Sequence, residues 1–420
     1  MRKSLDEWLL WQARLNPKEI DLGLDRVRDV AARLSLDPPA GAVFTVAGTN
    51  GKGSTVACID RLLTAGGCRT GVYTSPHLVR YNERVQATGQ YAGDDQLIAA
   101  FERIEAVRGE IPLTYFEFGT LAALLVFTAA QCDAWVLEVG LGGRLDAVNI
   151  VDPDFSLITT IALDHQDWLG DSVEQIATEK AGILRRDAPA FFGDVEVPAA
   201  VRARARELGT RLYCYGDDFV AIRDDDSWSF EGLRVRLDGL ALPDSGDDAA
   251  LRNLALALAA VEQFNPGIVT AANVARLIEA GRPAGRFQVV GDQPQWILDV
   301  AHNPQAARVL RERIDRLDEP RDTTALVGML ADKHVERFVE QLEGVVDRWV
   351  VASFSGPRTE DGELTVERIA SISNRPVEYG GDPGAAIDRA LQVTPGNGRV
   401  LCCGSFHIVG PALEALGLYS

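Results

Sequence analysis

A glycine-rich stretch at residues 46–55, VAGTNGKGST, limits the possible folds of this chain more than any other feature. It follows an apolar, strand-like run, AVFTVAG, and precedes a helical pattern over about 52–65. Its three glycines allow backbone N–H groups to approach a phosphate at the start of that helix, where the helix dipole also favours an anion. Lys52 would lie near the outer phosphates, and Ser54 could reach Mg²⁺. The stretch therefore predicts a nucleotide site, with an ordinary glycine-rich turn as the alternative.

Strand-like runs alternate with helical patterns through the first two thirds of the chain. The runs TGVYTS, DAWVLEVG and FSLITTIAL follow the first strand, with helical segments between them. This alternation predicts an α/β fold with a doubly wound, mostly parallel sheet of the P-loop type. Short alternating runs over 212–243 indicate hairpins at the domain edge, and a helix-rich segment follows over 247–281.

A second α/β region follows the best linker candidate, 281–286, in which two glycines and a proline interrupt the periodicity. Beyond it, QWILDV, TTALVGML, DRWVVASF and RVLCCG alternate with helices predicted over about 304–317 and 335–342. The sequence therefore predicts two domains, 1–284 and 285–420, and the second is a smaller, Rossmann-like α/β domain.

The composition excludes several classes of partner. A formal net charge of −19 argues against nonspecific binding to nucleic acid or to an anionic membrane, because both require a basic surface. The longest mostly apolar run, 119–130, is too short to cross a bilayer, and a cytoplasmic location is expected. The six cysteines show no Cys-x-x-Cys spacing, which favours buried free thiols over a zinc site or a redox pair.

Acidic and imidazole side chains follow several of the strand-like runs, where open α/β sheets bind their ligands. A carboxylate buried there must be paired or must ligate a cation, so Glu138 is either a Mg²⁺ ligand or a structural partner of Arg144. His77, His165 and His302 share this placement. A lone histidine is usually structural, but the repeated placement favours a common cleft.

Nine motifs, spread in order from about residue 43 to residue 410, resemble one known family. They are GTNGKGST, SPHLVRYNERV, TYFEFGTLAAL, LEVGLGGRLDAVNI, ALDHQDWLG, EKAGI, GRF, DVAHNP and CGSFH. The chain thereby resembles the bifunctional dihydrofolate synthases/folylpolyglutamate synthases, members of the Mur ligase superfamily. The extra glycine after the loop lysine is this family's version of the loop.

The resemblance implies an ATP-dependent acid–amino-acid ligase of folate biosynthesis with a Mur ligase-like fold. ATP would phosphorylate a substrate carboxylate, and the amine of L-glutamate would attack the acyl phosphate. The substrates would be dihydropteroate, giving dihydrofolate, and tetrahydrofolate (poly)glutamates. ATP, Mg²⁺ and K⁺ as an activator are the implied cofactors, although no residue is assigned to K⁺. Only small-molecule partners and a monomeric chain are expected.

The resemblance also implies roles for individual residues. The ATP contacts would be Gly48, Thr49, Asn50, Gly51, Lys52, Gly53, Ser54, Asn253, Arg286 and Asp299. The metal ligands would be Ser54, Ser75, Glu138 and His165. The catalytic residues would be Lys52, Glu138, His165, Lys180 and Arg286. The substrate contacts would be Arg84, Phe116, His302 and Ser405.

Lys180 matches the lysine that the family carbamylates. An ammonium cannot react with CO₂ until it is neutral, so this modification requires surroundings that lower the pKa of Lys180. A lysine on a helix surface is the alternative. Arg286 would reach the phosphates from the second domain, which would make catalysis depend on domain closure.

Other assigned residues have structural alternatives. Asn253 could be a hydrogen-bonded polar group of a helical core. Phe116 would stack on the pterin, but it could equally begin a core helix. The ordinary interpretation of Arg84, which is assigned to the acidic end of the substrate, is a surface arginine.

The chain departs from the family pattern in two places. Val148 replaces the threonine of a DATN motif, and His334 replaces the second aspartate of a DKD-like turn. Two other functions remain possible alternatives: a Mur ligase for a UDP-sugar peptide, and a P-loop phosphotransferase or NTP-driven binding module. The early position of the loop at Gly48 disfavours the first, because a separate N-terminal UDP-binding domain is missing.

Overall fold

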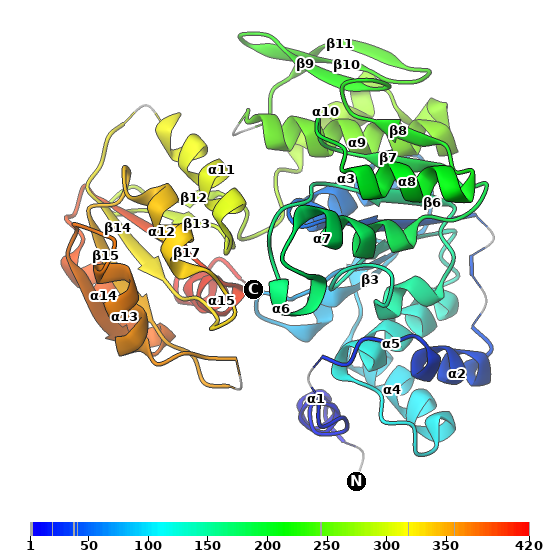
Figure 1. The fold of residues 1–420 in the computed structure, drawn as a ribbon, viewed down its shortest axis with the longest axis horizontal. Coiled ribbons are helices and arrows are strands. Elements are labelled where there is room, and N and C mark those ends of the chain that lie inside the picture. Colours follow the sequence, from blue (N-terminus) through cyan, green and yellow to red (C-terminus); the bar gives the residue numbers. More distant parts are fainter. Residues whose placement is uncertain are drawn as a thin grey trace. The chain divides into compact units, whose positions relative to one another are not determined.

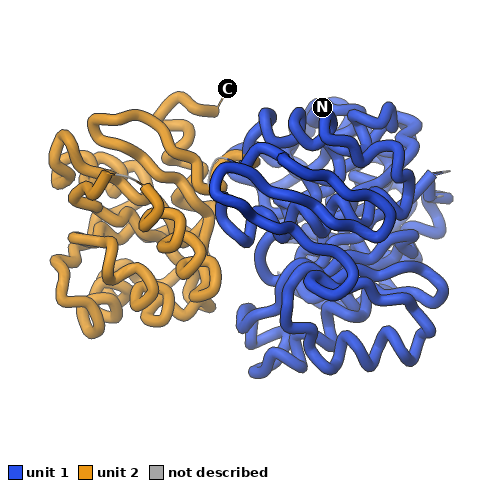
Figure 2. Tube along the Cα trace, turned by 90° about the horizontal axis from the view of Figure 1, so that it is seen from above, with its two compact units in different colours: residues 1–281 blue, residues 282–420 orange. Residues whose placement is uncertain are grey.

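The computed structural model describes residues 3–18, 20–36, 38–39, 41–243, 246–317, 319–356 and 358–419. The chain divides into two compact units, Met1–Gly281 and Arg282–Ser420 (Figure 2). Each unit has its own sheet and its own hydrophobic core. The division lies close to the boundary predicted after residue 284.

Within the described residues, unit 1 is built on an eight-stranded sheet with the order β4-β3-β2-β5-β1-β6-β7-β8. The strands are β1 (Ala42–Ala47), β2 (Thr70–Tyr73), β3 (Val85–Ala87), β4 (Gln90–Tyr91), β5 (Ala134–Glu138), β6 (Phe155–Ile158), β7 (Ala190–Phe192) and β8 (Leu212–Cys214). All neighbours from β2 to β8 are parallel, and only β3 and β4 pair antiparallel at one edge. This confirms the prediction of a mostly parallel sheet.

Helices cover both faces of this sheet, as expected for a doubly wound fold. They are α1 (Leu5–Gln12), α2 (Asp25–Leu34), α3 (Lys52–Ala65), α4 (Asp94–Arg108), α5 (Tyr115–Ala129), α6 (Gln166–Leu169), α7 (Val173–Lys180), α8 (Ala199–Leu208), α9 (Asp248–Phe264) and α10 (Ala271–Glu279). Short 3₁₀ turns are η1 (Tyr81–Arg84), η2 (Ala147–Ile150), η3 (Ala181–Ile183) and η4 (Pro266–Ile268). Helix α3 begins and ends where the sequence predicted, and it packs between the sheet and α9.

The hairpins predicted over 212–243 are present in part. Strand β8 joins the main sheet, while β9 (Val220–Arg223), β10 (Ser227–Glu231) and β11 (Arg236–Ala241) form a separate antiparallel sheet over α9 and α10 (Figure 1). The carboxylate of Glu262 on α9 accepts backbone N–H groups of the β10–β11 turn, from Leu233 at 2.7 Å and Val235 at 2.9 Å. This fully buried acid therefore fixes the small sheet to the helix.

Unit 2 contains, in its described part, a six-stranded sheet with the order β12-β13-β17-β14-β15-β16, in which only β12 is antiparallel. The strands are β12 (Gln288–Val290), β13 (Gln295–Leu298), β14 (Thr323–Val327), β15 (Arg348–Ala352), β16 (Val377–Gly381) and β17 (Arg399–Cys403). The helices are α11 (Pro304–Asp315), α12 (Val335–Leu342), α13 (Gly362–Ala370), α14 (Pro383–Val393) and α15 (Phe406–Ala415). The second α/β fold is thus confirmed.

The cysteines are free thiols, as predicted, and all are buried except the partly buried Cys68. Adjacent Cys402 and Cys403 on β17 are both fully buried, so both faces of this strand are covered. In the described part of the chain, the length and apolarity of every helix fall short of what a membrane span requires.

Candidate active site

The predicted nucleotide and metal residues of unit 1 follow four neighbouring parallel strands. Ser75 comes after β2, Glu138 ends β5, the glycine-rich loop follows β1, and His165 comes after β6. Because these strands are adjacent in the order β2-β5-β1-β6, their carboxyl ends form one edge, and Val46 of β1 pairs directly with Glu138 of β5. This edge is where open α/β sheets bind ligands.

The glycine-rich loop presents an uncapped helix N-terminus at this edge. Gly51 precedes α3 in a left-handed conformation with φ 88°, and no side chain caps the first turn of the helix. Nζ of Lys52 folds over the loop and donates to the carbonyl oxygens of Gly48 at 3.0 Å and Thr49 at 3.2 Å. Backbone donors beside a lysine match the chemistry of a phosphate site.

Two threonines after β6 brace the loop. The backbone N–H of Thr49 donates to the carbonyl of Thr160 at 2.7 Å, and the Thr159 hydroxyl donates to the Asn50 carbonyl at 2.6 Å. The Thr49 hydroxyl donates to the Ala162 carbonyl at 3.2 Å. Sequence reasoning did not identify Thr159 or Thr160, because nothing in the local pattern shows that they lie against a loop more than a hundred positions earlier.

Asn253 contacts the loop from α9. A Cβ atom on Gly51 would lie 2.6 Å from Oδ1 of Asn253, so the glycine and the amide are in close contact. The Asn253 side chain is only half-buried, unlike the apolar positions Leu254–Val261 that follow it. This placement favours the nucleotide assignment over a polar group in a helical core.

Glu138 is 4% exposed, and its Oε2 accepts the backbone N–H of Ser75 at 3.2 Å, which brings two predicted metal ligands together. The alternative pairing of Glu138 with Arg144 is wrong, because Arg144 instead pairs with Glu179 at 2.8 Å. His165 precedes α6 with φ 51°, and its Nε2 lies 4.0 Å from the Asp164 carboxylate.

The buried Glu138 carboxylate at this edge is of a ligand type that Mg²⁺ favours. In the described ranges, no three side chains of His, Cys, Asp or Glu are grouped in a way that could hold a metal ion. Mg²⁺ is commonly held by one or two carboxylates together with substrate phosphates and water. The buried carboxylate of Glu138 beside a phosphate loop fits that requirement.

Lys180 is a buried residue, which rules out the alternative of a lysine on a helix surface. It ends α7, its side chain lies almost wholly out of solvent, and its Nζ donates to the Gly48 carbonyl at 2.9 Å. Burial, and then the nearby charge of Lys52, lower the pKa of Lys180 to about 7. Two lysine side chains therefore converge on one carbonyl oxygen of the loop.

Asp146 is a buried acid at this edge that the sequence did not assign to the site. It is 3% exposed, and burial raises its pKa to about 6, although the backbone N–H groups of Leu141 at 2.8 Å and Val148 at 3.0 Å donate to it. The signal was present in the LDAVNI motif, where an acid stands among apolar residues. Val148, which departs from the family pattern, is fully buried.

Two predicted substrate contacts lie on neighbouring elements of unit 1. Phe116 lies in the first turn of α5, half-buried, with its ring 5.7 Å from that of Tyr73 and packed over Gly140 of the turn after β5. Arg84 ends η1 and donates through Nε to Nδ1 of His77 at 2.8 Å. Arg84 is half-buried, so it is not an ordinary surface arginine.

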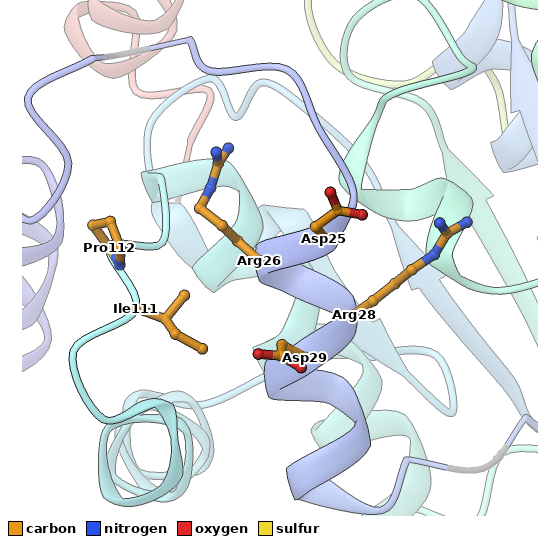
Figure 3. Close-up of a pocket in the computed structure, with 6 residues that line it drawn as sticks. All are labelled: Asp25, Arg26, Arg28, Asp29, Ile111 and Pro112. Atoms are coloured by element: carbon orange, nitrogen blue, oxygen red, sulfur yellow. The ribbon is translucent and has the colours of Figure 1, made fainter.

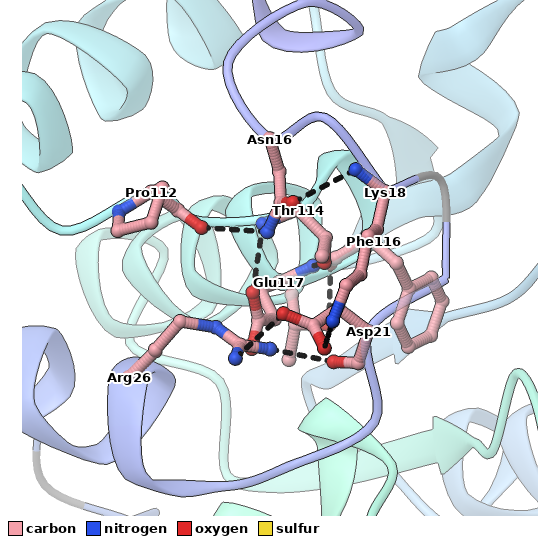
Figure 4. Close-up of polar contacts among 9 residues, drawn as sticks. Asn16, Lys18, Asp21, Arg26, Pro112, Thr114, Phe116 and Glu117 are labelled. Atoms are coloured by element: carbon pink, nitrogen blue, oxygen red, sulfur yellow. Dashed lines mark hydrogen bonds and ion pairs between the residues drawn. The ribbon is translucent and has the colours of Figure 1, made fainter.

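An ion pair holds the start of α5 to α2. Figure 4 shows Arg26 between Asp21 and Glu117, while Phe116 extends away from this network. Nη2 of Arg26 lies 3.1 Å from Oε1 of Glu117, whose side chain is 4% exposed. The Thr114 N–H donates to the other Glu117 oxygen at 2.7 Å. The residue after Phe116 is therefore fixed by both a helix cap and a charge.

A groove of about 610 Å³ lies beside this ion pair, where α2 faces the segment before α5 (Figure 3). Its lining residues are Asp25, Arg26, Arg28, Asp29, Ile111 and Pro112. None of them is a predicted site residue, and no motif in the sequence indicates this groove.

The predicted residues of unit 2 also share one sheet edge. Asp299 and His302 follow β13, and Ser405 follows its parallel neighbour β17. Asp299 is buried and accepts the N–H groups of Phe287 and Ala301, each at 2.8 Å. Ser405 caps α15.

Arg286 joins this group through α15, because its guanidinium lies 5.1 Å from the ring centroid of Phe406, the first residue of that helix. Unit 2 thus brings together the four residues assigned to it.

Two sequence families cover most of the chain. Residues 46–226 match the Mur ligase middle domain, and residues 285–406 match the Mur ligase glutamate ligase domain. Along almost its whole length, the chain is 43% identical to the dihydrofolate synthase/folylpolyglutamate synthase of Escherichia coli (strain K12), covering 98% of this chain and 95% of the relative. The chain belongs to the dihydrofolate synthase/folylpolyglutamate synthase family. The predicted family is thereby confirmed.

Solved structures of other family members have the same fold as this Mur ligase. E. coli FolC in complex with DHPP and ADP superposes with a TM-score of 0.93 at 42% identity, covering 99% of this chain and 98% of that chain. The bifunctional enzyme from Yersinia pestis CO92, complexed with AMPPNP and Mn, gives a TM-score of 0.90 at 41% identity over the same shares of each chain. The Mur ligase-like fold predicted from sequence is therefore confirmed for both units.

Proposed function

We propose that this chain is an ATP-dependent ligase that joins L-glutamate to dihydropteroate and to tetrahydrofolate (poly)glutamates. Its partners would be small molecules only, and it would act as a monomer in the cytoplasm. The observation that carries the proposal is the edge of unit 1, where a phosphate loop, the buried Glu138 and the buried Lys180 meet in a chain that aligns end to end with the E. coli relative.

ATP and Mg²⁺, when bound, would supply the phosphoryl group and the charge neutralisation that turn a substrate carboxylate into an acyl phosphate. Phosphoryl transfer depends mainly on positioning and electrostatics. The uncapped start of α3 and the Lys52 ammonium would hold phosphate oxygens, as the geometry of the loop allows. Ser54, Ser75, Glu138 and His165 would hold the metal, and Gly48, Thr49, Asn50, Gly51, Gly53 and Asn253 would form the cradle.

Lys180 would act as its carbamate. Its lowered pKa leaves a large fraction of the amine neutral near pH 7, which is the form that reacts with CO₂. The product replaces a positive charge beside Lys52 with a negative one. A carbamate at this position would hold Lys52 by attraction instead of repelling it.

The pterin would stack on Phe116, which is half-buried in the first turn of α5 and supported by the Glu117 ion pair. The acidic end of the substrate would meet Arg84. Unit 2 would supply the remaining contacts. Arg286 would contact the phosphates, and Asp299 would contact the ribose. His302 and Ser405 would both contact the incoming glutamate.

Phosphate release from ATP tests the proposal. The ligase should release phosphate only when both dihydropteroate and glutamate are present. A P-loop phosphotransferase or NTP-driven module would release it without either, and a ligase for UDP-sugar peptides would need a different acceptor. Oxygen-18 placed in the benzoate carboxylate of dihydropteroate should appear in the released phosphate, and its absence would rule out an acyl phosphate.

A further inference from the structure

The guanidinium of Arg84 is fixed on three sides. Its Cζ lies 5.6 Å from the ring centroids of both Tyr81 and Tyr115, and its Nε donates to Nδ1 of His77 at 2.8 Å. Among the residues that the structure describes, Arg84 has no carboxylate partner, and its two Nη groups donate to no protein atom. A half-buried cation held in this way is prepared for an anion from outside the chain.

The direction of the Nε bond determines where the rest of the guanidinium points. Nε and the Nη groups lie in one rigid plane. An acceptor that binds the Nε–H group therefore also fixes the direction in which the two Nη groups point, which is away from that acceptor. The two tyrosine rings hold the guanidinium by cation–π contact, but such contacts leave rotation within the plane less restricted than a directional hydrogen bond. The acceptor nitrogen of His77 is therefore the group that sets the orientation.

The backbone around Arg84 is held by groups other than the His77 imidazole. Glu83 accepts three consecutive backbone N–H groups, from Leu78 and Val79 at 2.7 Å and from Arg80 at 2.6 Å. The Arg84 carbonyl accepts the N–H of Thr74 at 2.9 Å. Removing the imidazole should therefore release the Arg84 side chain while this segment keeps its conformation.

We propose that His77 is a positioning residue for substrate binding, because its Nδ1 orients Arg84 so that both Nη groups face a carboxylate of the pteroate or folate substrate. The inference rests on the proposed function and on the assignment of Arg84 to the acidic end of the substrate. Since Nδ1 accepts a hydrogen bond, the ring proton of neutral His77 lies on Nε2. A side-chain amide oxygen can replace Nδ1 as the acceptor, whereas an aliphatic side chain cannot.

Two variants of His77 separate orientation from packing. His77→Leu should raise the KM for dihydropteroate by about ten-fold, because a charge-assisted contact is lost, while the KM for ATP stays within about two-fold. His77→Asn, which offers Oδ1 near the position of Nδ1, should recover most of that loss. A competitive pterin alcohol that lacks the benzoate should bind His77→Leu and the parent enzyme equally well.

Asn82→Ala is the matched control within the same turn. It removes the bonds from Asn82 Nδ2 to the Ala92 carbonyl at 2.7 Å and to Asp94 at 2.9 Å without touching Arg84. The KM for dihydropteroate should not change. An equal rise in Asn82→Ala and His77→Leu, or no rescue by His77→Asn, would show a packing effect and overturn the inference.

Arg84→Gln separates failure of the inference from failure of the proposed function. If Arg84→Gln leaves the dihydropteroate KM unchanged, the assignment of Arg84 itself is wrong. If Arg84→Gln raises KM but His77→Leu does not, only the role of His77 is wrong. In the double variant, His77→Leu should add nothing to Arg84→Gln, and an undiminished further rise would mean that His77 does not act through Arg84.

Discussion

Replacing Arg26 with methionine should loosen the start of α5, because it removes the cationic partner of a buried carboxylate. The Glu117 side chain is 4% exposed, and that of Arg26 is 26% exposed. Breaking a buried pair by removing one partner costs about 3–5 kcal/mol. The loss here should be smaller, since the Thr114 N–H still donates to Glu117 and water can reach a partly exposed position. We expect about 2–3 kcal/mol, which corresponds to roughly a 30- to 160-fold larger open population.

Hydrogen exchange measures this effect directly. The amides at the start of α5 should exchange faster in Arg26→Met by the expected factor, while amides of α3 keep their protection. The KM for dihydropteroate should rise with it, because Phe116 adjoins Glu117, and the KM for ATP should not. Adding Glu117→Gln should restore most of the protection by removing the unpaired charge.

The matched control is Arg28→Met, an exposed arginine on the same helix. In Arg28→Met, the amides at the start of α5 should exchange at the rate of the parent protein, and the KM for dihydropteroate should not change. The reasoning fails if Arg26→Met loses less than about 0.5 kcal/mol, the range of ordinary surface substitutions. It also fails if the double variant is as loose as the single one, because the charge of Glu117 would then not be the cause.

Four further outcomes are expected at the site. Lys52→Ala should abolish turnover without changing the fold, and retention of more than about a tenth of the activity would contradict its phosphate role. Lys180 should show an intact-mass increase of about 44 Da in native protein, and the increase should be absent from Lys180→Met. Because the pKa of unmodified Lys180 is about 7 when folded against 10.5 ordinarily, the unfolded chain binds more protons between these values. Denaturant titrations should therefore show unmodified protein gaining stability as pH rises through this window, and Lys180→Met losing that gain. Phe116→Ala should raise the dihydropteroate KM more than the ATP KM, whereas equal effects would indicate a packing defect.

Local sequence pattern was sufficient to predict those features of the fold and the site that single helices or strands define. Helix α3 was predictable because glycines stop at its first turn and an apolar periodicity begins there. The shared edge of Glu138 and the loop followed from parallel strands with their carboxyl ends together, whereas Ser75 was assigned only through the family resemblance. Both features depend only on the order of strands and helices along the chain.

Contacts between distant segments could not be predicted in this way. Arg26 and Glu117 are 91 positions apart. Glu117 stands in an apolar helix start, but nothing in the sequence near it indicates that its partner is Arg26. The contacts of Thr159 and Thr160 with the loop likewise join segments that are far apart in the sequence. The Arg84–His77 bond was not predicted either, although the repeated placement of histidines after strands indicated that His77 lies near the site. Such pairings depend on how elements pack, which hydrophobic periodicity does not encode.

The loop itself gives a physical reason why Lys180 would be modified. Nζ of Lys52 lies 3.0 Å and Nζ of Lys180 lies 2.9 Å from the Gly48 carbonyl, so two amines compete for one acceptor in a buried site. The free-energy cost of burying two charges and the repulsion between them both fall if one amine is neutral, and Lys180 is the more buried of the two. A neutral amine is the nucleophile that CO₂ requires, and its carbamate would be an anion beside Lys52. The geometry that lowers the pKa of Lys180 would thus both permit the reaction and stabilise its product.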